Sequence, residues 1–358
     1  MEFYAESRAL ARVRTDCAVV GVHEGGELGT AAAALDAALG GRLARIVRSG
    51  DFACRLGETL LLPDLGRSVA RVLLVGLGAR KSWNRRTFRR ALNAGAAALL
   101  KCGAKDALFL LGSEPVPDVD AYYRARFVAE AIGHATYRIP DLKTGKKPAR
   151  PALARVGVAT ERAEAAQVNR GLEHGRAVSA GSAVARDLGN LPANVCTPTY
   201  LGNYAKKLAR EHRALRVRVL GEPEIRRLGM GSFLSVTAGS EQPPRLIVIE
   251  YRGGAAGEAP VALVGKGITF DTGGISIKPA PGMDEMKWDM GGAASVFGAL
   301  AALATLGAEL NVVGIVPACE NMPSGRATKP GDVVTSMSGQ TIEVLNTDAE
   351  GRLLLCDA

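Results

Sequence analysis

Carboxylates and lysines that could hold metal ions are concentrated in the last hundred residues of this 358-residue chain. The positions are Lys266, Asp271, Asp289, Asp348 and Glu350. Lys266 and Asp271 follow one expected strand, where open α/β sheets keep their ligands. Asp348 and Glu350 lie two residues apart at the end of another. Carboxylate oxygens suit hard or borderline divalent ions, and two ions bridged by shared carboxylates can polarise a carbonyl and generate hydroxide from water. The pattern predicts a metal centre, which Lys266 could join only as a neutral amine with a lowered pKa.

Other metal chemistries find little support in the residue types. The chain has four histidines, none in an H-E-x-x-H frame, and six cysteines without a C-x-x-C pair. Any metal site must therefore rest mainly on oxygen ligands, and the thiols are expected to be free.

Each candidate residue also has an ordinary structural interpretation. Asp289 directly precedes an apolar helical stretch and could cap it. Lys278 could be a solvated lysine, Arg352 could pair with Asp348 within a helix, and Met286 could fill the core. A phosphate-binding loop at Gly265 is disfavoured, because the required Ser or Thr after the lysine and the first spaced glycine are missing.

Three segments resemble one family of metal-dependent exopeptidases, the leucyl (cytosol) aminopeptidases. The octapeptide 346–353 (NTDAEGRL) matches the family's most diagnostic motif. Segments 264–271 (VGKGITFD) and 273–279 (GGISIKP) match its first metal-site segment, and 187–194 (DLGNLPAN) matches the entry into its catalytic domain. The resemblance runs from about residue 180 to the end of the sequence.

The resemblance implies a role for each candidate. Asp271 and Glu350 would bridge two divalent ions, Mn²⁺ or Zn²⁺, while Lys266 and Asp289 complete the tighter site and Asp348 the more exchangeable one. Lys278 would polarise the scissile carbonyl, and Arg352 would hold a bicarbonate ion as general base. Part of the pocket for the first side chain would be formed by Met286, Asn346 and Ala349.

The family resemblance also predicts substrate and assembly. Short peptides with a free N-terminus would be shortened by one residue, preferably leucine-like, inside a homohexamer. The sequence ends within an expected helix just after Glu350, so we expect the catalytic domain to be incomplete here and this chain alone to be poorly stable and weakly active or inactive.

The elements that must position these residues alternate between strands and helices. Apolar runs predict strands at 18–22, 71–75, 107–111, 246–249, 261–264 and 312–316, with helices at 161–187 and 291–306. We expect an α/β protein with two α/β/α domains joined by a long helix, the second domain having a mixed, mostly parallel sheet. The expected boundaries are 1–162, a linker helix at 163–188 and the catalytic domain at 189–358, and the Pro- and Lys-rich stretch 140–151 supports the end of the first domain.

The net positive charge of the chain comes from the first domain. Residues 1–162 carry 26 Lys and Arg against 16 Asp and Glu, which leaves the rest of the chain close to neutral. One segment, 80–90, holds six bases beside Trp83 and Phe88: Arg80, Lys81, Arg85, Arg86, Arg89 and Arg90. Such a patch could bind DNA as a regulatory or recombination accessory, which is the alternative function. The simpler interpretation, a solvated helix face with both aromatic residues in the core, is favoured.

Two further possibilities are weak. Gly76 and Gly78 lack the third glycine and the acid that a dinucleotide site needs. The longest apolar stretch, 296–308, falls short of the ~18 residues that a membrane span needs, and no secretory signal is readable. We therefore expect a cytoplasmic protein without membrane partners.

Overall fold

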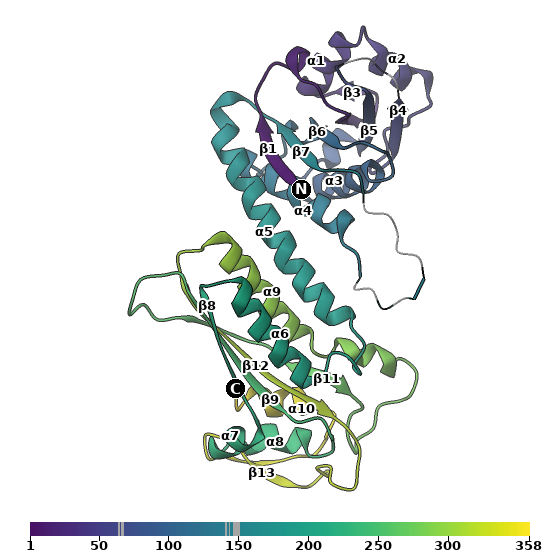
Figure 1. Cartoon of the computed structure of the whole chain (residues 1–358). Coiled ribbons are helices and arrows are strands. Elements are labelled where there is room, and N and C mark those ends of the chain that lie inside the picture. The colour runs from purple at the N-terminus through teal and green to yellow at the C-terminus, as the bar shows by residue number, and fades with distance from the viewer. Residues whose placement is uncertain (64, 66–67, 140–141, 143, 146–150) are drawn as a thin grey trace. The chain divides into compact units, whose positions relative to one another are not determined.

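The computed structural model describes the whole chain except residues 64, 66–67, 140–141, 143 and 146–150. It divides into two compact units, unit 1 (1–138 and 143–179) and unit 2 (139–142 and 180–358). Helix α5 (Ala165–Asn190) begins in unit 1 and ends in unit 2, as Figure 1 shows. Most of the Pro- and Lys-rich stretch that was expected to end the first domain lies outside the described residues.

Unit 1 contains a sheet in the order β1-β7-β6-β2-β5-β4, with β3 beside β2. Its strands are β1 (Glu2–Glu6), β2 (Cys17–His23), β3 (Glu27–Leu28), β4 (Thr59–Pro63), β5 (Arg71–Gly78), β6 (Asp106–Phe109) and β7 (Arg155–Ala159). The four neighbouring pairs from β1 to β5 are parallel. Strand β4 is antiparallel to β5, and β3 is antiparallel to β2. The strands predicted near 18–22, 71–75 and 107–111 are confirmed.

Helices cover both faces of this sheet. They are α1 (Thr30–Ala38), α2 (Arg42–Ser49), α3 (Arg85–Leu99) and α4 (Ala121–Thr136), with short 3₁₀ turns at Leu10–Arg12, Arg80–Ser82, Leu111–Ser113 and Arg162–Glu164. Side chains alternate along each strand, so Val19 packs with α3 and α4 while Val20 packs with α1 and α2. Two apolar cores therefore flank one sheet, in the predicted α/β/α arrangement.

Unit 2 has a mixed sheet in the order β10-β12-β9-β8. Its strands are β8 (Leu215–Leu220), β9 (Arg245–Arg252), β10 (Val261–Val264), β11 (Gly267–Asp271) and β12 (Asn311–Asn321), and a separate hairpin joins β13 (Val333–Thr335) to β14 (Thr341–Glu343). Strands β10 and β11 are parallel to β12, whereas β9 is antiparallel to both β12 and β8. The mixed α/β class is confirmed.

The helices of unit 2 also lie on both faces of its sheet. They are α6 (Pro198–Glu211), α7 (Glu222–Arg227), α8 (Gly231–Thr237), α9 (Gly291–Leu306) and α10 (Glu350–Leu355), with a 3₁₀ helix, η5, at Met283–Trp288. Helices α6 and α9 share one core, and Phe233 of α8 packs with Leu353 and Leu354 of α10 in the other. Figure 1 shows α6 and α9 together over the sheet, and α8 near α10. The helix predicted at 291–306 is confirmed.

One helical stretch, Met283–Leu306, is long and apolar enough by composition to cross a membrane. It consists of η5 followed by α9, and α9 buries Ala293, Phe297 and Leu300 in the protein core. This burial is the pattern of an internal helix that packs against a sheet.

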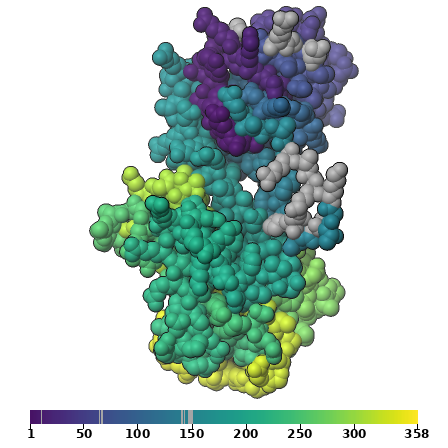
Figure 2. Space-filling view, viewed as in Figure 1, coloured from purple at the N-terminus to yellow at the C-terminus, as the bar shows by residue number. Residues whose placement is uncertain are grey.

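Large apolar side chains are exposed near the end of unit 2. Val333, Met337 and Leu345 are each more than half exposed, and Leu355 of α10 is also exposed. In the space-filling view, yellow residues of this C-terminal stretch lie at the edge of unit 2 (Figure 2). Such a group of exposed apolar residues is typical of a surface that contacts further protein.

The strand pairing along one edge of the unit 2 sheet is interrupted close to the candidate site. Strands β10 and β11 both pair with β12, first along 312–315 and then along 318–321. Between them the strand pairing is interrupted at Gly265 and Lys266, although the Gly265 amide still donates to the Ile315 carbonyl at 2.9 Å and the pairing resumes in the same register. The register of this edge shifts only later, between Ile268 and Asp271, where β11 ends at the candidate site.

Candidate metal centre

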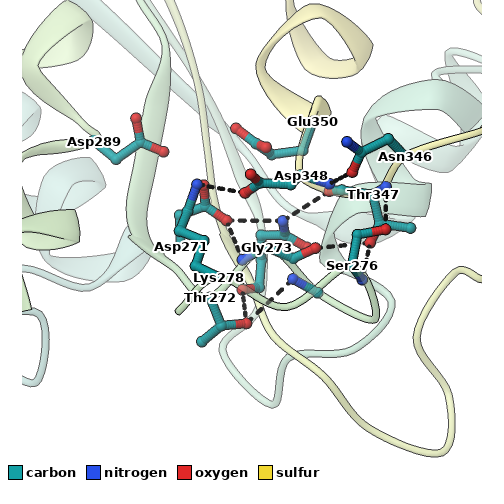
Figure 3. Close-up of polar contacts among 12 residues, drawn as sticks. Asp271, Thr272, Gly273, Ser276, Lys278, Asp289, Asn346, Thr347, Asp348 and Glu350 are labelled. Atoms are coloured by element: carbon teal, nitrogen blue, oxygen red, sulfur yellow. Dashed lines mark hydrogen bonds and ion pairs between the residues drawn. The ribbon is translucent and has the colours of Figure 1, made fainter. Parts of the chain in front are cut away.

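All five residues predicted to bind metal lie close together, near the carboxyl ends of β11 and β12 and the start of α10. Lys266 Nζ lies 2.9 Å from Asp289 Oδ1 and 2.6 Å from Glu350 Oε1. Lys278 Nζ lies 3.0 Å from Asp271 Oδ2 and also contacts Asp348. Oxygens of Asp271, Asp348 and Glu350 lie within 4.8 Å of one another. Figure 3 shows Asp271 and Lys278 facing Asp348, with Glu350 beside them and Asp289 entering from a separate element.

The backbone at Gly265 and Gly292 determines where Lys266 sits. A Cβ at Gly265 would lie 2.5 Å from the Gly292 carbonyl oxygen, and one at Gly292 would lie 2.7 Å from the Lys266 amide nitrogen. The Ala293 amide donates to the Lys266 carbonyl at 2.8 Å. Only glycine permits this approach of the start of α9 to the strand break, and the approach brings Asp289 to Lys266.

Asp271 is held by neutral donors. Its Oδ1 accepts hydrogen bonds from the Gly273 amide and from Asn321 Nδ2, both at 2.8 Å, and Asp271 is only 1% exposed. Asn321 also donates to the Thr347 carbonyl at 3.0 Å. One amide side chain thus ties the end of β11 to the segment that carries Asp348 and Glu350.

The two metal-site segments are joined a second time through Thr347. Its hydroxyl donates to the Gly273 carbonyl at 2.7 Å and accepts from the Ser276 amide at 2.9 Å, while Ser276 Oγ accepts from the Thr347 amide at 3.1 Å. Gly273 and Gly274 adopt left-handed backbone angles, with φ of +85° and +66°, which favour glycine. These bonds, visible in Figure 3, fix the loop that leads to Lys278.

Burial and mutual contact shift the pKa values of this cluster. Burial disfavours the charged Lys266, but its hydrogen bonds with Asp289 and Glu350 outweigh that effect and raise the pKa of Lys266 above its usual value. The same balance, with Asp348 and Asp271 as partners, raises the pKa of Lys278. Burial also raises the pKa of Asp289 and of Glu350, despite the neighbouring ammonium group. The carboxylates alone therefore keep Lys266 charged, and only nearby cations could make it a neutral ligand.

Oxygens without partners indicate what the cluster lacks. Asp289 Oδ2 and Glu350 Oε2 are buried and accept no hydrogen bond from the described residues. Four carboxylates face two ammonium groups, so the cluster carries two excess negative charges when all six groups are ionised. Buried carboxylate oxygens are costly unless they are hydrogen-bonded or coordinate a cation. The donor set, with oxygens from four acids and one lysine, fits divalent metal ions.

The remaining predicted residues surround this cluster without joining its ion pairs. Arg352 lies in the first turns of α10 with an exposed side chain, and among the described residues it forms no ion pair with Asp348. Met286 is half-buried in η5, Asn346 is exposed and accepts from the Asp348 amide at 2.8 Å, and Ala349 is half-buried. The capping interpretation of Asp289 is wrong, since Met290 is the N-cap residue of α9.

Family models match both parts of the chain. The catalytic-domain model of the cytosol aminopeptidase family matches residues 183–358, and the model of that family's N-terminal domain matches residues 19–146. The chain belongs to the cytosol aminopeptidase family. The predicted family and the enzyme class, an aminopeptidase, are thereby confirmed.

Individual relatives agree with this assignment. The probable cytosol aminopeptidase of Alkalilimnicola ehrlichii is 49% identical over all of this chain and 72% of its own length. The corresponding protein of Pseudomonas aeruginosa is also 49% identical, with the same coverage. Among solved structures, a mutant tomato leucine aminopeptidase has a TM-score of 0.83 at 30% identity, covering 100% of this chain and 70% of that one. The bottromycin maturation enzyme BotP in complex with Mn has a TM-score of 0.78 at 35% identity, covering 96% and 68%.

Three polar residues of the candidate metal centre were missed in the sequence: Ser276, Asn321 and Thr347. Ser276 and Thr347 lie inside the quoted motifs. Their closeness in sequence to the predicted metal-binding residues was the only signal for them. Asn321 ends an eleven-residue strand whose other inward residues are apolar. A polar residue at the carboxyl end of a buried strand is the signal that could have found it.

The basic segment of the N-terminal unit is largely engaged within the protein. Trp83 and Phe88 are buried in the core, as the simpler interpretation required. Arg80 pairs with Glu27 at 2.6 Å, Arg89 pairs with Glu130 at 3.4 Å, and Arg85 lies over the ring of Phe127. The exposed bases without such contacts among the described residues are Lys81, Arg86 and Arg90. DNA binding by this segment stays a prediction.

The glycine pair of the weak nucleotide-site interpretation has a structural explanation. A Cβ at Gly76 would lie 2.0 Å from the Arg55 carbonyl oxygen, and Gly78 has a φ of +71°. Gly76 is therefore required by the close backbone approach of the segment before β4, and Gly78 is favoured by its left-handed backbone angle.

Proposed function

We propose that this protein removes the N-terminal residue from short peptides with the help of two divalent metal ions. The observation that carries the proposal is the convergence of Asp271, Asp348 and Glu350, together with the unpartnered buried oxygens of Asp289 and Glu350. A purely structural salt-bridge cluster would satisfy these oxygens internally. Family membership supports the peptidase reaction.

Lys266, Asp271, Asp289, Asp348 and Glu350 would hold the ions. Following the family resemblance, Asp271 and Glu350 would bridge them, Lys266 and Asp289 would complete one site, and Asp348 the other. Such ions, Mn²⁺ or Zn²⁺, polarise a carbonyl and lower the pKa of water when bound. Asn321 and the Gly273 amide occupy Asp271 Oδ1, which leaves Oδ2 facing the cluster.

Lys278 would act as a hydrogen-bond donor to the scissile carbonyl oxygen. Hydrogen bonds with Asp348 and Asp271 raise its pKa, which favours the charged ammonium form that a hydrogen-bond donor needs. A fixed ammonium group near a developing negative charge lowers the barrier of acyl transfer. The loop bonds of Thr347 and Ser276 keep this lysine in place.

Arg352 would hold a bicarbonate ion as the general base. Its guanidinium is always charged, exposed, and free of acidic partners among the described residues. It lies two residues beyond Glu350 on α10, so a bicarbonate bound there would be close to the metal cluster. Met286, Asn346 and Ala349 would line part of the pocket for a leucine-like first side chain.

Hydrolysis of leucine anilide with Mn²⁺ or Zn²⁺ tests the proposal, beside a chelator control. Asp348→Ala and Lys278→Ala are compared with Asp284→Ala and Lys206→Ala, which remove exposed charges of the same unit. We expect metal-dependent turnover that both site variants lose and both control variants keep. Calorimetric titration with Mn²⁺ gives a second readout, in which Asp348→Ala binds metal more weakly whereas Lys278→Ala does not.

Two results would contradict the proposal. Turnover that persists after chelation would exclude the metal mechanism. Mn²⁺ affinity that is unchanged in Asp348→Ala would remove Asp348 from the ligand set, whether or not the chain is active.

The proposal also includes a homohexameric assembly and a cytoplasmic location. Sedimentation velocity tests the homohexamer, and fractionation tests the cytoplasmic location that the relatives' name, cytosol aminopeptidase, supports. Neither result changes the interpretation of the metal-binding assay.

A further inference from the structure

A cavity of about 520 Å³ lies in unit 1, apart from the residues of the candidate metal centre. Its wall includes residues that follow the carboxyl ends of β1, β2, β6 and β7, among them Arg8, Thr30, Glu114 and Thr160. The chain leaves β2 toward β5 on one side and leaves β6 toward β7 on the other. This makes the β2–β6 boundary a topological switch point, the place where open α/β sheets bind ligands.

Ion pairs already satisfy both arginines of the wall. Arg8 Nε donates to Glu6 Oε1 at 2.9 Å, and Arg124 Nη2 lies 3.3 Å from Glu164 Oε2. Arg124 also donates to the Gly112 and Val119 carbonyls. An anionic ligand would have to compete with these internal acids, so the arginines are poor candidates for its recognition.

Glu114 is the exception among the buried charges of this wall. It is only 5% exposed, and none of the described residues donates a hydrogen bond to its carboxylate. Its oxygens lie against Gly29, where a Cβ would come within 1.8 Å of Glu114 Oε1. Gly29 and the neighbouring turn therefore make room for a carboxylate whose one favourable charge neighbour among the described residues, Arg80, is itself paired with Glu27.

The charges around the cavity favour a cation. Glu6, Glu114, Glu161 and Glu164 face Arg8 and Arg124, which leaves two acids in excess. The next charged groups, Arg80 and Glu27, neutralise each other at 2.6 Å. Burial raises the pKa of Glu114 to about 7, a cost that a bound cation would offset.

We propose that this cavity binds a small organic molecule through a primary ammonium group that pairs with Glu114. The volume accommodates an amino acid or a short polyamine, and the two share the recognised ammonium group. This site is independent of the proposed peptidase chemistry, because all of its lining residues belong to unit 1.

Isothermal titration calorimetry at pH 8 with putrescine and with L-lysine tests the site on the full metal-loaded chain. The variants are Glu114→Gln and Ala34→Arg, the latter placing a positive charge at an exposed lining position of α1. Ala33→Arg is the matched control, since Ala33 is exposed on the same helix but does not line the cavity. We expect binding to weaken at least about tenfold in both test variants and to be unchanged in the control.

Asp348→Asn separates this cavity from the metal centre. Binding that survives in Asp348→Asn but weakens in Ala34→Arg supports the proposal even if Glu114→Gln fails to fold. Tighter binding of L-lysine than of putrescine would identify an amino acid as the ligand, and the reverse a polyamine. Absence of binding to the unaltered chain at millimolar concentration, or equal binding in Ala34→Arg and Ala33→Arg, would overturn it.

Discussion

Two regions of this molecule are dense in charge, the metal-centre cluster of unit 2 and the basic segment 80–90 of unit 1. The cluster draws its charges from separate segments that converge on one buried point, and two of its oxygens lack partners. The basic segment lies on one continuous stretch, with several bases paired or stacked and both aromatic residues in the core. Local charge density is therefore weak evidence of a site, whereas convergence of distant residues with unsatisfied buried groups is strong evidence.

Removing the charge of Glu350, a proposed bridging ligand, should have the largest effect. Glu350→Gln keeps the size of a side chain that is only 2% exposed but takes away its charge. We expect activity on leucine anilide and Mn²⁺ affinity to fall by about 100-fold or more, since even partners of ligands cost 10–100-fold. Glu343→Gln, at an exposed position of β14, is the control. Equal loss in both variants would contradict a specific role of Glu350 in metal binding.

Replacing Asn321, which positions Asp271, should have the second largest effect. Asn321→Ala leaves Asp271 Oδ1 with one donor and breaks the bond to the Thr347 carbonyl. We expect a loss of about 10-fold in Mn²⁺ affinity, with activity restored at high Mn²⁺ concentration. Asn311→Ala, at the other end of β12, should not change metal affinity. A loss of activity that added Mn²⁺ cannot restore would point to a merely structural role.

The glycines at the start of α9 allow a sharp stability comparison. Gly292→Ala places a Cβ 2.7 Å from the Lys266 amide, whereas a Cβ at Gly291 meets nothing within 4 Å. We expect Gly292→Ala to lower the free energy of unfolding by about 1–3 kcal/mol and to weaken metal binding. Gly291→Ala should be neutral in both measurements. Chemical denaturation and calorimetry check these outcomes.

The effect of Glu114 on the pH dependence of folding stability should be smaller than the effects of the three preceding variants. Because its pKa is raised to about 7, the folded chain binds more protons than the unfolded chain between pH 4.5 and 7. Its contribution to stability is therefore greatest at low pH and is lost as the pH rises through that window. Glu114→Gln should raise the free energy of unfolding relative to the unaltered chain by on the order of 1 kcal/mol at pH 8 but not at pH 5, which chemical denaturation at the two pH values measures. A constant difference at both pH values would contradict the shift.

The basic segment should show the smallest effect on the enzyme. Replacing Lys81, Arg86 and Arg90 by alanine should leave peptidase activity unchanged and stability within about 0.5 kcal/mol, because these side chains are exposed. A gel-shift titration against salt tests the DNA alternative with the same variant. Binding that weakens with salt and with the triple replacement would favour phosphate contacts. Binding that is independent of salt would exclude them.

The residues of the candidate metal centre could be named from the sequence, whereas the groups that hold them in place could not. Motifs carry Lys266, Asp271, Asp289, Asp348 and Glu350, and apolar runs predicted β12 and α9 correctly. Short or amphipathic elements such as β1, β7 and α4 gave no comparable signal, and pairing order requires contacts between distant segments. The role of Asn321 depends on its register opposite Asp271, which local pattern cannot reveal.

The cavity at Glu114 was also invisible in the sequence. Its wall comes from the ends of four strands, and a lone glutamate after an apolar run has nothing to distinguish it from a surface residue. Only the sheet order identifies the switch point, and only burial shows that Glu114 lacks a partner.

The strand break at Gly265 and Lys266 has a consequence for insertions and deletions. Because β10 and β11 are both aligned against the single strand β12, the distance between Lys266 and Asp271 is set by the length of β12 as well as by their own segment. Adding or deleting one residue between Ile315 and Ala318 would shift one pairing relative to the other and separate the lysine from the carboxylates. Relatives that keep the metal centre should therefore vary in length in their surface loops, and not between residues 264 and 271 or 312 and 321.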